Sequence, residues 1–72
     1  MTPTPAETLR AHRTLKGLTL RKLARKTGIS AGHLCNLENG KLGFSHRSAY
    51  ILSRYFKVGI NRFLDNHSRD PQ

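Results

Sequence analysis

The stretch GISAGHLCNLENG, residues 28–40, carries three side chains of different chemistry close together. They are an imidazole (His33), a thiol (Cys35) and a carboxamide (Asn36). An imidazole and a thiol can bind a metal or work as a base and a nucleophile, whereas a carboxamide can pair with the edge of a nucleobase. The spacing of these residues decides which of these chemistries the chain can perform.

Metal binding does not fit the spacing. His33 and Cys35 are two residues apart, so on a helix they face different ways. The other histidines are His12, His46 and His67, and none stands in a C-x-x-C or H-x-x-x-H frame. We therefore expect no metal and no cofactor. A redox role for Cys35 stays open.

Catalysis finds no support either. The four acidic residues, Glu7, Glu38, Asp65 and Asp70, are isolated from one another in the sequence. No nucleophile stands beside a base in the pattern that covalent catalysis needs. The chain is therefore predicted not to be an enzyme.

The charge of the chain points to a polyanionic partner. Thirteen Lys and Arg residues against four Asp and Glu give a formal net charge of +9. Such a balance suits the neutralisation of phosphates, which favours nucleic acid as the partner. A membrane-surface helix would need a long, broad apolar face, and the chain is too often interrupted by glycine for that.

Length and composition predict one small domain in the cytoplasm. The chain has 72 residues, a single Cys and an apolar fraction of 36%. One Cys cannot form an internal disulfide, and neither a secretory signal nor a membrane span is visible. No segment suggests a site for a small-molecule ligand.

Glycines and capping residues divide the chain into short helices. Thr4-Pro5-Ala6-Glu7 has the pattern of a capping box, and Thr19, Ser30 and Ser45 each suit an N-cap. We expect helices over residues 5–16, 20–27, 31–38 and 46–56, and a last short helical turn over 60–65. These elements form one domain, residues 5–65, between a flexible arm (1–4) and a flexible tail (66–72).

The second and third helices are joined by Gly28-Ile29-Ser30 alone. So short a connection makes two helices cross steeply, as in a helix-turn-helix. Ala24 is small at the point of close approach, and Leu34 and Leu37 have the spacing of an inner helix face. The fold class expected is an all-α, compact five-helix domain with a helix-turn-helix in helices 2 and 3.

Residues 7–64 resemble the Cro and phage-repressor type (XRE-like) helix-turn-helix family, in a lambda-repressor-like fold. The resemblance rests on LTLRKLARKTGISAGHLCNLENGK and on the later ending V-x-I-x-x-F-L. It implies that the second motif helix lies in the major groove of double-stranded DNA, usually within a two-fold symmetric dimer.

The resemblance assigns base contacts to the exposed side of residues 31–38. The base-reading positions here are Ala31, Gly32, His33 and Asn36. Asn36 suits a bidentate pair with adenine, and Ala31 suits a thymine methyl. Gly32 has no side chain, so it either lets DNA approach the backbone closely or reads nothing.

The predicted phosphate contacts are polar or basic residues around the motif: Arg21, Lys22, Ser30, Asn39, Lys41, His46 and Arg47. The family often places Gln at the position of Leu20 and contacts a phosphate with it. Leu20 cannot make that contact, although backbone amides at the helix N-terminus remain available.

The resemblance also implies two structural roles. An ion pair between Arg13 and Glu38 would brace the third helix from behind. Ile60, Phe63 and Leu64 would form a dimer seam, with Ile60 and Leu64 alternatively closing the core.

The function expected from the sequence is a sequence-specific DNA-binding transcriptional regulator. The basic surface of residues 21–26, where activators of the family often carry acidic residues, favours a repressor that occupies its operator as a homodimer. The setting implied is a prokaryotic or phage one, on the nucleoid. The alternatives are an antitoxin-type or partner-bound regulator and an architectural binder of low specificity.

Overall fold

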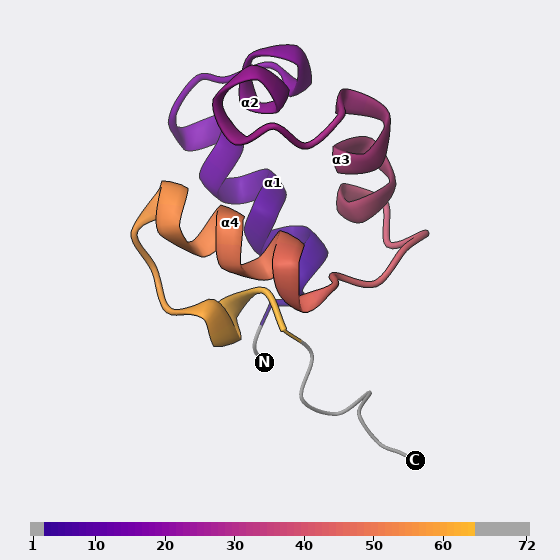
Figure 1. Cartoon of the computed structure of the whole chain (residues 1–72), viewed down its shortest axis with the longest axis vertical. Helices are drawn as coiled ribbons and strands as arrows, with labels where there is room; N and C mark the ends of the chain where they lie inside the picture. Colours follow the sequence, from indigo (N-terminus) through magenta and orange to yellow (C-terminus); the bar gives the residue numbers. More distant parts are fainter. Residues whose placement is uncertain (1–2, 65–72) are drawn as a thin grey trace.

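Four α-helices and one 3-10 helix make up the computed structural model, which describes residues 3–64 (Figure 1). The part described contains no strand. In chain order the elements are α1 (Pro5–Leu15), α2 (Leu20–Thr27), α3 (Ala31–Glu38), α4 (His46–Phe56) and the 3-10 helix η1 (Ile60–Arg62). α3 packs against both α1 and α2, and η1 packs against α4.

Each α-helix begins at the capping residue that the sequence indicates. The side-chain oxygens of Thr4, Thr19, Ser30 and Ser45 each accept a hydrogen bond from the backbone N–H three residues later. Glu7 returns the bond to the Thr4 amide and completes the capping box. These bonds satisfy amides that the helix itself leaves without a partner.

The core draws on all four α-helices and on the segment after them. Its fully or nearly fully buried members are Leu9, Leu23, Leu34, Leu37, Ala49, Leu52, Phe56 and Phe63. His12 is half-buried beside this cluster, with its ring 5.4 Å from that of Phe56, and its Nδ1 lies 2.9 Å from the Thr8 carbonyl oxygen. Leu34 and Leu37 therefore anchor the inner side of α3 in the core, and the opposite side of this helix faces outward.

The end of the described chain differs from the expected fifth helix. Only Ile60–Arg62 is helical, as a single 3-10 turn in which the N–H of Phe63 bonds to the Ile60 carbonyl. Burial of the Phe63 side chain anchors this segment, so it needs no regular helix of its own. Residues 1–2 of the predicted arm, Asp65 and the tail 66–72, with His67 and Asp70, lie outside the described residues.

Among residues 3–64, no helix is long and apolar enough to cross a membrane. The same residues hold no group of three or more His, Cys, Asp or Glu side chains with the placement of a metal site.

Candidate nucleic-acid interface

The turn between α2 and α3 fixes how the two helices cross. Gly28 has a φ of +78°, and its N–H bonds to the Ala24 carbonyl at 2.8 Å, which ends α2 in a left-handed residue. Thr27 Oγ accepts a bond from the Ile29 N–H at 3.3 Å, and Ile29 packs against the core. Ser30 then caps α3. Local hydrogen bonds and the inward-packed Ile29 side chain thus fix the direction in which α3 begins.

The exposed side of α3 is nearly bare. Leu34, Leu37 and Glu38 are buried, which at 100° per residue turns Gly32 and Asn36 outward. Gly32 is exposed and Asn36 is half-buried, whereas Ala31 and His33 are half-buried on the two flanks of this side. Cys35 also lies here, half-buried, although the expected reading positions did not include it. Cys35 follows Gly32 by three residues, and residues three apart are neighbours on a helix surface, so the sequence itself indicates that Cys35 borders this side.

Asn36 and Asn39 differ in what they can offer a ligand. The Asn36 backbone carbonyl accepts bonds from the Lys41 and Leu42 amides, but its side chain bonds to no other residue in the described chain. The Asn39 side chain accepts from Arg10 at 3.2 Å and donates to the Cys35 sulfur at 3.4 Å. Asn36 therefore presents a free carboxamide, whereas Asn39, a predicted phosphate contact, is already engaged within the protein.

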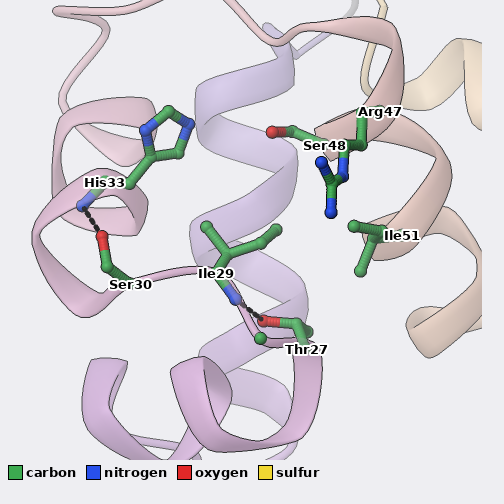
Figure 2. A pocket seen from close by; sticks show the side chains of 8 residues that line it. Thr27, Ile29, Ser30, His33, Arg47, Ser48 and Ile51 are labelled. Carbon is green, nitrogen blue, oxygen red and sulfur yellow. Dashed lines mark hydrogen bonds between the residues drawn. The ribbon is translucent and has the colours of Figure 1, made fainter.

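A notch of about 440 Å³ separates the start of α3 from the start of α4. In Figure 2, His33 from α3 and Arg47 from α4 stand on opposite sides of it, and Ser30 and Ser48 also line it. The Ser30 side chain is bound to the His33 amide as the helix cap, so its hydroxyl accepts inside the protein. The structure thus brings three of the predicted contacts, Ser30, His33 and Arg47, to one depression.

The remaining predicted phosphate contacts are all on the surface. Arg21 and Lys22 on α2, Lys41 after α3, and His46 with Arg47 at the start of α4 are exposed. None forms an ion pair with a carboxylate in residues 3–64. The lysines and arginines around α3, and the His46 imidazole, are therefore available to phosphates.

Behind α3, Glu38 forms an ion pair with Arg13 of α1. Arg13 Nε lies 2.5 Å from Glu38 Oε2, and the same guanidinium donates to Glu38 Oε1 at 3.1 Å. The Arg13 Nη1 atom donates to the Leu18 carbonyl at 2.6 Å, so one side chain joins α1, α3 and the α1–α2 turn. The Glu38 side chain is only 3% exposed. Its hydrogen bond, with the charge of the carboxylate, raises the pKa of Arg13 above its ordinary value, against the opposing effect of burial.

The predicted dimer seam divides into two kinds of residue. Phe63 is fully buried and stacks on Phe44 with ring centroids 5.7 Å apart, so it belongs to the core rather than to an exposed seam. Ile60 and Leu64 are half-buried against the same core. Of the three residues of the predicted seam, these two therefore keep part of their apolar surface exposed.

Comparison with known families settles which fold family carries this site. A family model described as helix-turn-helix matches residues 9–63. The chain belongs to the Cro and phage-repressor type helix-turn-helix family. Its members are DNA-binding regulators, and this supports DNA binding and regulation in general terms. A comparison with curated proteins gave no match.

Two residues of this helix-turn-helix domain depart from what the motif alone suggests. Leu20 is half-buried and packs against the core, so α2 begins with an apolar anchor in place of a polar contact. Arg10, which we did not predict, lies 3.5 Å from Glu38 and also holds Asn39. Its spacing of three from Arg13 places both arginines on one side of α1. That spacing is the signal in the sequence that identifies Arg10.

Replacing Gly32 with alanine is expected to stabilise the domain by about 0.5–1 kcal/mol, because glycine is a poor helix former. No atom lies within 4 Å of the place that the new Cβ would take. Gly28→Ala is the matched control: it also meets open space, but its φ of +78° makes alanine unfavourable, so stability should fall by about 1 kcal/mol. Urea denaturation of both variants measures these shifts.

DNA binding by Gly32→Ala separates the two interpretations of that residue. Weaker binding by this more stable variant would show that DNA approaches the backbone closely. Unchanged DNA affinity would show that position 32 makes no contact that contributes to base recognition. Loss of stability in Gly32→Ala would contradict the open environment seen around it.

Proposed function

We propose that the chain is a sequence-specific transcriptional repressor that binds an operator in double-stranded DNA as a homodimer. The single observation that carries this proposal is the free Asn36 carboxamide on the outward side of α3. That side chain has no partner among residues 3–64, and an amide in this setting suits bidentate pairing with adenine in the major groove.

The cations that surround α3 support the positioning part of this function. Lys41 follows α3 and Arg47 lies in the first turn of α4, so positive groups lie on the C-terminal side of the reading helix and across the notch from it. The His46 imidazole stands next to Arg47 in the chain. Phosphate contacts of this kind fix register, while base contacts confer specificity. Repression then follows from occupancy, because a bound dimer excludes polymerase from the same DNA.

Dimerisation is proposed for two reasons. One domain of this size offers a small footprint on DNA, and Ile60 and Leu64 leave apolar area at its C-terminal end. A two-fold dimer would place its reading helices about 34 Å apart, one turn of the duplex.

Selection from a library of random DNA duplexes tests the proposal. We expect one preferred sequence with two related halves about one helical turn apart. Its affinity should exceed that for a scrambled duplex by about 10³ or more at physiological salt. Equal affinity for both duplexes would reject sequence-specific recognition and favour the low-specificity architectural binder, which the bare side of α3 also suits.

A further inference from the structure

We define the α2 corner as Leu18, Lys22, Arg25 and Lys26, which line one groove, together with Leu15, which stands three residues before Leu18. Leu15 ends α1 and is 85% exposed, more than Leu42 and Tyr50, the other exposed large apolar residues among residues 3–64. Leu18 and the three cations line a shallow groove of about 600 Å³. Because only three residues of chain separate them, the Cα atoms of Leu15 and Leu18 are at most about 11 Å apart.

DNA binding does not account for the apolar part of this corner. The groove contains none of the base-reading residues of α3. A phosphate backbone offers charge and hydrogen-bond acceptors, but nothing that gains from covering a leucine. Leu18 packs in part against the core, whereas Leu15 does not belong to that cluster. The exposed apolar area of Leu15 therefore serves neither the core nor a phosphate.

The charge of the corner selects the kind of partner. The two carboxylates in residues 3–64 are Glu7, which is bound in the cap at the far end of α1, and Glu38, which is buried and paired. Lys22, Arg25 and Lys26 thus form no ion pair in that part of the chain. A second copy would bring its own excess of positive charge. A segment with carboxylates beside an apolar side chain fits both properties of the corner.

We propose that the α2 corner binds an acidic, amphipathic segment of a partner protein. Carboxylates of that segment face Lys22, Arg25 and Lys26, and its apolar side chains cover Leu15 and Leu18. The contact would bring a second protein to a surface that contains none of the base-reading residues of α3 and that shares only Lys22 with the predicted phosphate contacts. It does not depend on the proposed operator specificity.

Fluorescence anisotropy with three synthetic helical peptides tests this proposal on the full chain. One peptide alternates pairs of Glu with pairs of Leu, the second replaces each Glu with Gln, and the third replaces each Leu with Ser. We expect binding of the first alone, since both charge and apolar area are required. Equal binding of the Glu/Ser peptide would overturn the proposal, because charge alone would then account for it.

Substitutions at the corner locate the contact. Leu15→Gln removes exposed apolar area without touching the core and should weaken peptide binding about tenfold. Leu42→Gln, at another exposed leucine outside the corner, should leave it unchanged. Peptide binding unaffected by Leu15→Gln would overturn the proposal. So would a fall in duplex DNA affinity of the same size, which would make the corner a DNA-binding surface.

Discussion

Replacing Arg13 with alanine is expected to lower the free energy of unfolding by about 3–5 kcal/mol, the cost of breaking one half of a buried ion pair. A domain of this size has a total stability of roughly 4–11 kcal/mol. The loss corresponds to a fall in melting temperature of more than about 12 °C. Thermal unfolding followed by circular dichroism measures it.

The size of this effect follows from the groups that lose their partner when Arg13 is replaced, namely the Glu38 carboxylate and the Leu18 carbonyl. Glu38 is 3% exposed and receives two bonds from the Arg13 guanidinium. Without them its charge stays in the interior with only Arg10, at 3.5 Å, to face it. The Leu18 carbonyl loses its bond as well. The substitution therefore weakens both the contact of α1 with the α1–α2 turn and the contact of α1 with α3.

The pair keeps its arginine charged through the whole accessible pH range. The pKa of Arg13 is raised in the folded state by its bond to Glu38. A raised pKa means that the stabilisation is present below the ordinary pKa and is lost only as the pH rises through the folded one. Since both values are strongly alkaline, the arginine side of the pair does not titrate near neutral pH.

Arg10→Ala is the matched control for Arg13→Ala. Its side chain is 58% exposed and its contact with Glu38 is longer, so we expect a loss of no more than about 1 kcal/mol. Glu38→Ala should also destabilise the domain. The double variant with Arg13→Ala should be less destabilised than the sum of the two, by about 1–3 kcal/mol. Equal effects of Arg10→Ala and Arg13→Ala, or simple additivity, would contradict a buried brace.

The helix boundaries could be predicted from the sequence because they depend on neighbouring residues. A Thr or Ser oxygen binds an amide three residues later, and Gly28 supplies a left-handed residue at small cost, so both signals are local. The end of α4 at Phe56 agrees with the predicted bounds, although the left-handed residue after it, Lys57 with a φ of +60°, is not a glycine. The Val58 amide bonds back to the Ser53 carbonyl and Val58 packs against the core, and these contacts stabilise the cap.

Features that depend on how helices cross were harder to predict. Arg10 reaches Asn39 across 29 positions of sequence, and only the packing of α1 on α3 brings them together. Phe63 has the type and spacing of either a core or a seam residue, and only the placement of the chain after α4 buries it. The outward side of α3 could be inferred from its inner leucines, but the hydrogen bonds of the Asn39 side chain could not.

Asn36→Ala is expected to reduce the sequence preference proposed for this domain. A bidentate amide–adenine pair contributes about 1–3 kcal/mol of discrimination, so affinity for the preferred duplex should fall by about 5- to 150-fold. Affinity for scrambled DNA should stay the same, since the Asn36 side chain carries no charge. The ratio of the two affinities is therefore the quantity to measure, at one fixed salt concentration.

Lys41→Ala is the control that separates reading from positioning. Lys41 is exposed and its amide, not its side chain, holds the end of α3 through the Asn36 carbonyl, so the fold should be unaffected. Loss of one phosphate contact should weaken binding to both duplexes alike and reduce the slope of log affinity against log salt by about one. Because α3 presents so few other side chains, Asn36 must supply much of any specificity. A ratio unchanged by Asn36→Ala would leave the outward side of α3 without a base reader.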